Sequence, residues 1–325
     1  MAASTLSLAG ALVLSVLSFL EHDRSVRPSS LLSIYLFASV LLDAPQARTL
    51  CLRDRHSPPT VLFLTGLVFK FCVLLLEVVE KRPFLKIPYQ SWPPEALAGT
   101  LNRNVFWWLN PLFLRGYSGV LVLADLFYLD PALTSENVHP RFRQTWDAEV
   151  NKRSPYALVK VTTRCLWRQL MATVVPRLFL VGLKLCQPLL THRAVSLLSE
   201  PDSQSKTNTG RALIGATALM YAGIAFSTAR YKQNTNRLLS IARCGLVGLI
   251  YDATLQLPTF SAGRSAAVTL MSTDVERIVS GLQLIDSLWA GPIEIAISIY
   301  LLNQQIGVFC VTSVVLAFGR HSTSP

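Results

Sequence analysis

The segment TLNRNVFWWLNPLFLRGYSGVLVLADLFYLD, residues 100–130, decides how the rest of the chain can fold. Its side chains are mostly apolar and aromatic, but two arginines, a proline and a glycine interrupt it before it could cross about 30 Å of hydrocarbon. The adjacent Trp107 and Trp108 are typical of the headgroup zone, where an aromatic ring keeps one edge in water. We predict a segment at the membrane surface. The alternative, a buried turn of a soluble domain, conflicts with the hydrophobic runs of spanning length on both sides.

The composition also indicates an integral membrane protein. Of the 325 residues, 51% are hydrophobic and 15% are charged, whereas soluble domains carry about 25% charged residues. The net charge is +11, but the basic residues are dispersed between apolar runs and form no stripe of the kind that binds nucleic acid. Retention of basic loops on the cytosolic side of a membrane explains them better.

Cysteine and histidine give no sign of a metal site. The six cysteines include no C-x-x-C pair, and the five histidines are spread along the chain. We interpret the cysteines as small hydrophobic residues and predict no metal site and no disulfide framework. Paired carboxylates and a nucleophile with a positioned base are equally absent from the pattern, which disfavours a membrane-bound enzyme.

Three hydrophobic runs precede the surface segment. Residues 1–20 lack a basic start and a cleavage site, so a membrane span is favoured over a signal peptide. Residues 31–42 form an apolar run too short to be decisive alone, and residues 61–79 form a clearer span. Lys70 lies inside this last run. We expect its ammonium to reach the interface, the alternative being that it faces a helix bundle.

Residues 80–154 are polar and basic and read as a linker that carries the surface segment. Prolines at its start prevent a continuous helix. Leu123, Leu126 and Leu129 recur at three-residue spacing, which predicts a short amphipathic turn with the neighbouring aspartates on its wet side. Basic residues near the end of the linker place it in the cytosol.

Residues 166–198 predict a kinked helix, because Pro176 and Pro188 lie inside a long apolar run. Arg177 and Lys184 are about two helical turns apart and therefore share a face. Two cations on one face inside a membrane indicate a cavity that attracts anions, or else two side chains that reach opposite interfaces. The pattern favours neither reading.

A polar loop is expected at residues 200–210, followed by a proline-free helix over residues 211–257 that crosses the membrane and continues into the cytosol. Pro258 ends it. A small-residue connection follows.

Thr273 and Glu276 have the spacing of a capping box, which predicts a new helix start. Residues 275–302 then return through the membrane, and residues 308–318 begin another span. The predicted topology has three spans before the linker and four after it, with the start of the chain outside.

Several motifs resemble one family. They are FWWLNPLFLRGY (106–117), ADLFYLD (124–130), TSENV (134–138), LMSTDVERI (270–278) and SLWAGPIEIAISIYLL (287–302). The first three resemble the linker of the C subfamily of ABC exporters, the multidrug-resistance-associated proteins, which include fungal ABC multidrug transporters. The last two resemble the first intracellular turn and the next helix of the same family.

The resemblance implies an all-α integral membrane fold in three parts. Residues 1–80 correspond to the last three helices of an extra N-terminal transmembrane domain, and residues 81–154 to a cytosolic or interfacial lasso linker. Residues 155–325 correspond to the first helices of an ABC exporter (type 1) transmembrane domain, truncated here.

The resemblance also implies site residues. Arg177 occupies a position where relatives carry a basic residue that contacts substrate. Lys184, from its helix face, and Trp289, in the middle of the returning helix, complete the substrate-cavity candidates. The coupling turn, which presses on the first nucleotide-binding domain in the family, comprises Ser272, Thr273, Asp274, Glu276 and Arg277. The lasso motif comprises Phe106, Trp107, Trp108, Gly116, Tyr117, Asp125 and Leu126. Asp252 is a departure, since relatives usually carry a basic residue there.

The nucleotide-binding parts of the family are missing from this chain. No G-x-x-x-x-G-K-[ST] motif occurs, because in GRALIGAT (210–217) Ala216 replaces the required lysine. An LSGGQ-like signature is also missing. We expect no cofactor and no catalytic residue in this chain, with ATP and Mg²⁺ bound by the nucleotide-binding domains of the intact family, whose members are ATPases.

The leading hypothesis is therefore the N-terminal membrane part of an ATP-driven exporter of amphipathic drugs, toxins or organic anions, inactive alone. Its expected partners are membrane lipid, the missing nucleotide-binding domains and second half, and a small-molecule substrate, but no nucleic acid. A non-transporting membrane module that binds or regulates a partner protein is the alternative. The plasma membrane is favoured over the vacuolar membrane.

Overall fold

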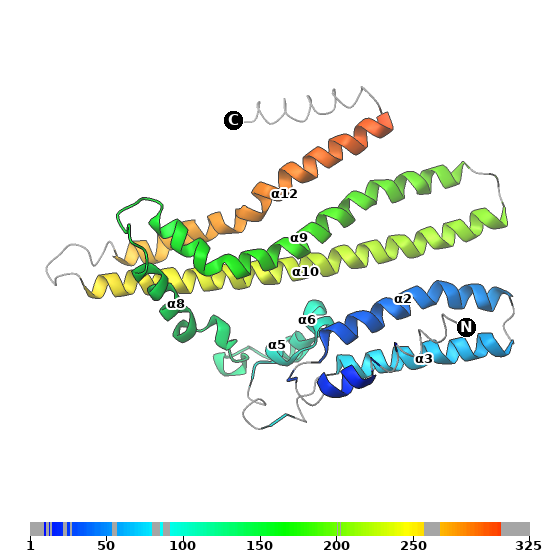
Figure 1. The fold of residues 1–325 in the computed structure, drawn as a ribbon, viewed down its shortest axis with the longest axis horizontal. Coiled ribbons are helices and arrows are strands. Elements are labelled where there is room, and N and C mark those ends of the chain that lie inside the picture. The colour runs from blue at the N-terminus through cyan, green and yellow to red at the C-terminus, as the bar shows by residue number, and fades with distance from the viewer. Residues whose placement is uncertain are drawn as a thin grey trace. The chain divides into compact units, whose positions relative to one another are not determined.

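The computed structural model describes residues 10, 13, 15–21, 25–26, 28–53, 57–79, 85–86, 92–199, 201, 203–256 and 267–306. Every regular element in these ranges is a helix, which confirms the predicted all-α fold class. The chain divides into two compact units, Met1–Asp130 and Pro131–Pro325, which are described separately. Figure 1 shows the helices of both units.

Five helices within the described ranges are long and apolar enough to cross a membrane. They are Ser30–Arg53, Pro58–Val78, Ala157–Leu198, Gln204–Leu255 and Ala267–Gln304. The short apolar run at residues 31–42 is thus part of a helix of full spanning length. The predicted span at residues 308–318 lies outside the described residues, as does most of the one at residues 1–20. The protein is a multi-pass membrane protein.

The first unit is built on a helical hairpin. Helices α2 (Ser30–Arg53) and α3 (Pro58–Val78) lie side by side, with Leu32, Leu36 and Leu74 buried between them. Ser29 caps α2, because its hydroxyl accepts a hydrogen bond from the Leu32 amide at 3.1 Å.

The contacts of Lys70 differ from the prediction that its ammonium reaches the membrane interface. Its ammonium donates to Asp43 Oδ2 at 2.6 Å and to Ser39 Oγ at 2.9 Å, so it pairs with side chains of the facing helix α2. The expected snorkelling is therefore wrong. A carboxylate and a hydroxyl on the neighbouring helix satisfy the charge within the hairpin, where an unpaired charge would be costly.

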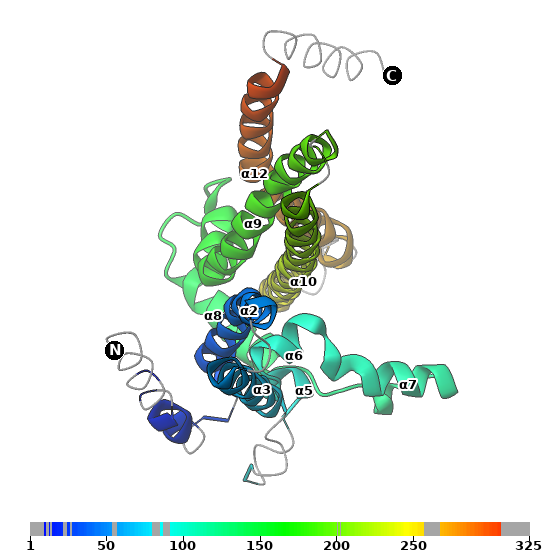
Figure 2. The same ribbon diagram turned by 90° about the vertical axis from the view of Figure 1, so that its right-hand side faces the viewer.

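The surface segment and the residues just before it form a series of short helices. These are α5 (Pro94–Leu97), α6 (Thr100–Val105), the 3-10 turn η2 (Trp107–Leu109), α7 (Asn110–Ser118) and the 3-10 turn η3 (Leu123–Asp125). Helix α6 contacts α2 and α3, whereas α7 projects away from them in Figure 2. Apolar side chains on α7 are left uncovered by the chain, as expected for a segment that lies in the membrane surface.

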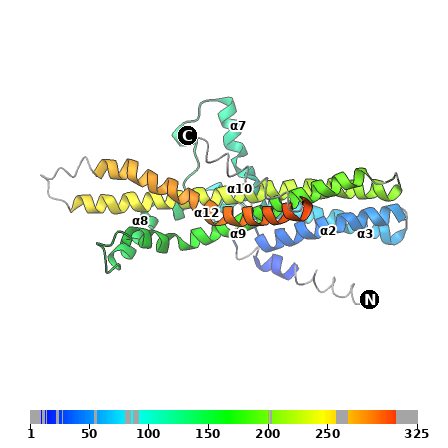
Figure 3. The ribbon, with the colours of Figure 1, turned by 90° about the horizontal axis from the view of Figure 1, so that it is seen from above.

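The described part of the second unit contains three long helices and one short one. After the turn η4 (Pro131–Leu133) come α8 (Ser135–Asp147), α9 (Ala157–Leu198), α10 (Gln204–Leu255) and α12 (Val275–Ile306), the last preceded by the π-helical turn η5 (Leu270–Asp274). The axes of helices α9, α10 and α12 are nearly parallel when seen from above, and the chain runs along α10 in the opposite sense to α9 and α12 (Figure 3). Figure 1 shows the bend in α9, a helix that contains Pro176 and Pro188, as predicted.

Two helix starts differ from the predictions. Helix α10 begins at Gln204, inside the expected loop, because the Ser203 hydroxyl caps it by accepting from the Lys206 amide at 3.1 Å. The predicted helix start at Thr273 is wrong, since helix already runs from Ala267. Within this continuous helix the Ser272 hydroxyl donates to the Val268 carbonyl at 2.9 Å, a bond of the kind that distorts a helix locally, and the turn here is π-helical.

Helix α8, which the sequence pattern did not indicate, packs closely on α10. Phe142 is 1% exposed and lies over Gly245, where an added Cβ would come within 2.5 Å of the ring. The His139 ring covers Gly248 in the same way. His139 Nε2 lies 2.9 Å from Asp252 Oδ2, so Asp252 on α10 anchors α8.

We expect Asp252→Ala to loosen α8. The change removes the acceptor shared by His139 and Arg143, at 2.9 and 3.6 Å, and hydrogen bonds to charged groups contribute about 1.5–3 kcal/mol. The measurement is the thermal unfolding midpoint of the detergent-solubilised chain, with the protease sensitivity of α8. Asp147→Ala is the control, because the exposed Asp147 forms a surface ion pair with Lys152 and its loss should cost little. Equal midpoints for the two variants would refute the anchoring role.

Candidate functional site

An ion pair joins two of the membrane-spanning helices in the second unit. Arg177 on α9 places Nη2 2.9 Å from Glu294 Oε1 on α12, and the side chains are 13% and 29% exposed. The guanidinium carbon of Arg177 lies 5.4 Å from the ring centroid of Tyr231 on α10, which is cation–π distance. Arg177 on α9 therefore contacts one side chain on α10 and one on α12.

A second acid extends this group. Asp286 on α12 is 6% exposed, and its Oδ1 accepts hydrogen bonds from Thr173 Oγ1 at 3.2 Å and from Trp289 Nε1 at 3.3 Å. Tyr231 interacts electrostatically with both Asp286 and Arg177, which makes the two pairs one cluster. We call Thr173, Arg177, Tyr231, Asp286, Trp289 and Glu294 the three-helix cluster.

Such a cluster is costly to build within a membrane. An ionisable side chain in a spanning helix is stable only with a partner, and residues of this kind usually face a bundle interior or a path for substrate or ions. Here the guanidinium of Arg177 pairs with the carboxylate of Glu294, while Asp286 accepts from Thr173 and Trp289. Arg177 Nε is buried without a hydrogen-bond partner among the described residues, so the guanidinium retains a donor that a ligand could use. The arrangement can bind an anionic group at Arg177 and stack an aromatic group on Tyr231 or Trp289.

The structure brings two of the three predicted substrate-cavity residues together and places the third apart from them. Arg177 and Trp289 both belong to the three-helix cluster, whereas Lys184 is exposed on α9. Arg177 does not stand as an open cation, because it pairs with Glu294. Pairing with Glu294 is a third arrangement, in which the carboxylate neutralises the cation inside the bundle.

Four members of the cluster were missed at the sequence level: Thr173, Tyr231, Asp286 and Glu294. A signal was available, because Asp286 and Glu294 interrupt the predicted span at residues 275–302. Two acids in a spanning helix require partners. Which partners they find depends on how α9 and α12 face each other, and one sequence does not specify this.

The predicted coupling residues lie near the N-terminal end of the continuous helix that includes η5 and α12. Ser272, Thr273 and Asp274 are in the π-helical turn η5. Glu276 on α12 accepts hydrogen bonds from Arg243 on α10, the shortest 2.7 Å long. This contact links α10 to α12 at the ends that we predict to lie in the cytosol. Arg277 Nη1 lies 3.8 Å from Asp274 Oδ1 at the surface. The connection at residues 257–266 lies outside the described residues.

The first lasso-motif residues reverse the chain after α6. Phe106 adopts a left-handed backbone with φ of 57°, which ends α6 and turns the chain into η2. Trp107 is 65% exposed, whereas the ring of Trp108 packs at 6.0 Å from that of Phe127. The two tryptophans therefore differ: Trp107 faces outward, and Trp108 packs within the segment.

The later lasso-motif residues surround a turn. Gly116 lies against Leu121, whose Cδ1 would be 3.3 Å from an added Cβ, and Tyr117 is exposed. Asp125 accepts from the Val122 amide at 3.1 Å and so caps η3. Leu126 and the other leucines of the predicted amphipathic turn are exposed within this unit.

Comparison with known proteins found no matching family model. Curated relatives are nevertheless clear. The chain is 40% identical over 319 residues to ABC multidrug transporter B of Aspergillus fumigatus, covering 97% of this chain and 22% of that protein. It is 38% identical to ABC multidrug transporter lscH of Purpureocillium lilacinum, covering 93% and 20%, and 38% identical to ABC transporter ecdL of Aspergillus rugulosus, covering 91% and 20%. The chain thus has fungal ABC multidrug transporters as homologues and spans about a fifth of the length of the curated relatives it matches.

Proposed function

We propose that the chain is the membrane-spanning N-terminal part of an ATP-driven exporter of the C subfamily of ABC transporters. The similarity to fungal ABC multidrug transporters and the five spanning helices support this proposal. The motifs at residues 106–117 and 270–278 support the subfamily. In the intact exporter, nucleotide-binding domains elsewhere would hold ATP and Mg²⁺, and this chain would be inactive alone.

We propose the same three parts as above: the end of an N-terminal transmembrane domain (residues 1–80), the lasso linker (81–154) and the start of the first ABC transmembrane domain (155–325). The lasso motif would lie in the membrane surface, and Ser272 to Arg277 would receive movement from a nucleotide-binding domain. The contact between Arg243 and Glu276 supports this role, because it would make α10 and α12 move together.

The three-helix cluster is the observation that carries the proposal. An anionic or amphipathic substrate would compete with Glu294 for the Arg177 guanidinium, while Trp289 and Tyr231 offer aromatic faces to its apolar part. Release of Glu294 would loosen α12 from α9. A ligand that binds the separated state better shifts the bundle toward that state, which is how binding couples to alternating access.

The test is ATP-dependent uptake into inside-out vesicles that contain the intact protein. A fluorescent glutathione conjugate serves as the organic anion, and rhodamine 123 as a cationic comparison. We expect uptake of the conjugate with ATP and none with a non-hydrolysable analogue. Uptake that is independent of ATP would contradict the proposal. Immunolocalisation of the intact protein would test the plasma membrane as its site.

A second candidate is a non-transporting membrane module that binds or regulates a partner protein. The exposed apolar side chains of α7, Phe113 and Leu114 among them, favour this candidate, because an uncovered helix face can serve a partner as well as lipid. Normal folding and membrane insertion of the intact protein without any ATP-dependent uptake, together with a stoichiometric membrane partner, would select it.

A further inference from the structure

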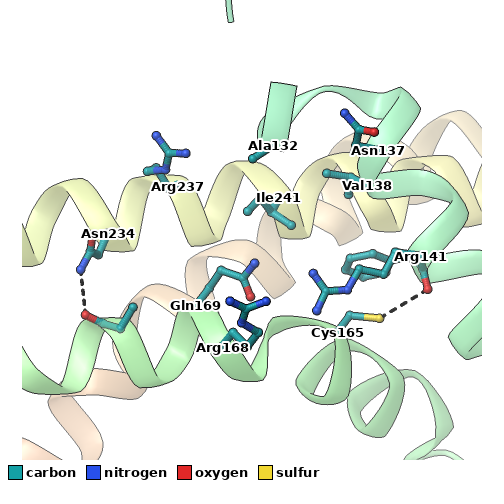
Figure 4. Close-up of a pocket in the computed structure, with 12 residues that line it drawn as sticks. Ala132, Asn137, Val138, Arg141, Cys165, Arg168, Gln169, Asn234, Arg237 and Ile241 are labelled. Carbon is teal, nitrogen blue, oxygen red and sulfur yellow. Dashed lines mark hydrogen bonds between the residues drawn. The ribbon is translucent and has the colours of Figure 1, made fainter. Parts of the chain in front are cut away.

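A second polar feature of the unit Pro131–Pro325 is a cavity of about 470 Å³ between α8, α9 and α10 (Figure 4). Its polar lining comprises Asn137 and Arg141 from α8, Arg168 and Gln169 from α9, and Asn234 and Arg237 from α10. Phe142 and Ile241 supply apolar wall. No member of the three-helix cluster lines this cavity.

The charge of the cavity is of one sign. Three arginines line it, and none of the lining residues is a carboxylate. Figure 4 shows the end groups of Arg141, Arg168 and Gln169 coming together, whereas Arg237 projects away from them. Among the described residues, neither Arg141 nor Arg168 forms an ion pair. Guanidinium groups that converge without a protein carboxylate fit an anion, and their planar forks match phosphate oxygens.

The amide of Gln169 adds a second requirement. Its Oε1 is buried and accepts no hydrogen bond among the described residues. A buried acceptor of this kind is costly unless a donor reaches it. A fully ionised phosphate offers only acceptors, so a ligand that satisfies Gln169 as well needs a donor of its own, such as a hydroxyl group.

The depth of the cavity indicates where such a ligand comes from. Gln169 on α9 and Asn234 on α10 each lie about 30 residues from the polar turn that joins these helices, or about 45 Å of helix at 1.5 Å per residue. A bilayer is about 40–45 Å thick with its headgroups. If the turn emerges at one face, both helices place the cavity at the phosphate level of the opposite leaflet.

We propose that this cavity binds a phosphate group carried on a hydroxylated ring, with inositol phosphate as the chemical class. Arg141 and Arg168 hold the phosphate, and Gln169 accepts from a ring hydroxyl. The ligand bridges α8 to α9 and fixes the linker against the spanning helices. The site is separate from the transport path and does not depend on the proposed export activity.

The experiment uses the full chain in a mild detergent and follows the unfolding midpoint by tryptophan fluorescence. Three probes are titrated: short-chain phosphatidylinositol 4-phosphate, soluble inositol 1,4-bisphosphate, and short-chain phosphatidylcholine. We expect a saturable rise with the first and none with the third. A rise with inositol bisphosphate at equal affinity assigns the site to a soluble ligand. A markedly weaker response to it than to the lipid assigns the site to a headgroup.

Variants separate a built site from general attraction. We expect Arg141→Gln with Arg168→Gln to weaken the apparent affinity at least about tenfold, and Gln169→Leu to weaken it about threefold. Arg164→Gln with Lys232→Gln removes the same charge from exposed positions outside the cavity and should leave the affinity unchanged. If the double variant of the cavity is too unstable to titrate, Arg168→Lys keeps the charge, loses the fork and should weaken binding to an intermediate degree.

Three results would overturn the proposal. The first is an unfolding midpoint that neither of the two inositol phosphate probes raises. The second is an equal loss of affinity in the cavity variants and in the charge-matched control, which would indicate diffuse attraction. The third is unchanged affinity in both Arg168→Lys and Gln169→Leu.

Discussion

Replacing Phe142 by alanine will destabilise the unit Pro131–Pro325 more than any other single truncation in α8. The ring is 1% exposed and packs with Val138, Cys165, Leu166 and Leu238, so its loss leaves a cavity at the junction of α8, α9 and α10. Truncation of a buried phenylalanine costs about 3–5 kcal/mol. The thermal unfolding midpoint of the chain in detergent measures the effect.

The matched control is Phe113→Ala on α7, since Phe113 is 64% exposed within its unit. It should leave the midpoint nearly unchanged in detergent. Gly245→Ala provides a second view of the same contact, because the added methyl group displaces the Phe142 ring and should also lower the midpoint. A midpoint for Phe142→Ala equal to that for Phe113→Ala would show that α8 is not held as described.

The second large effect concerns Arg177. Arg177→Leu removes the cation that pairs with Glu294 and leaves the carboxylate of Glu294 without its ion-pair partner. Breaking a buried pair from one side costs about 3–5 kcal/mol, and the 29% exposure of Glu294 places the expected loss near the lower end, about 3 kcal/mol. The readout is the unfolding midpoint, with the yield of monodisperse protein.

Two comparisons isolate the pairing. Lys184→Leu changes the same charge on the same helix at an exposed position and should cost little. The double variant with Arg177→Leu and Glu294→Leu should be more stable than Arg177→Leu alone, because it removes both charges together. If the double variant is the less stable of the two, the ion pair does not account for the effect.

The long helices were predictable because their signal is local. A run of apolar residues without proline is sufficient to indicate α10, and two prolines inside an apolar run indicate the bend of α9. The all-α membrane class follows from the same pattern. The start of α10 was placed too late because the single hydroxyl of Ser203 determines it, inside a segment whose composition is that of a loop.

Helix α8 and the polar pairs were not predictable for a different reason. Pro140 lies inside α8, and a proline usually argues against a helix, yet contacts of Phe142 and His139 with glycines on α10 hold the helix in place. Lys70 and Arg177 were recognised as charges within spans, but their partners, Asp43 and Glu294, lie on other helices. Partner choice depends on helix facing, which is a tertiary property.

The most direct test of the proposed transport role is a charge swap in the intact exporter, assayed as ATP-dependent uptake of a glutathione conjugate into vesicles. Arg177→Glu and Glu294→Arg each place like charges together, and each should reduce uptake at least about tenfold. The swap of both residues restores the pair and should recover a substantial part of the uptake. Full uptake in either single variant, or a well-folded swap no more active than the single variants, would contradict the role of this ion pair in the transport path.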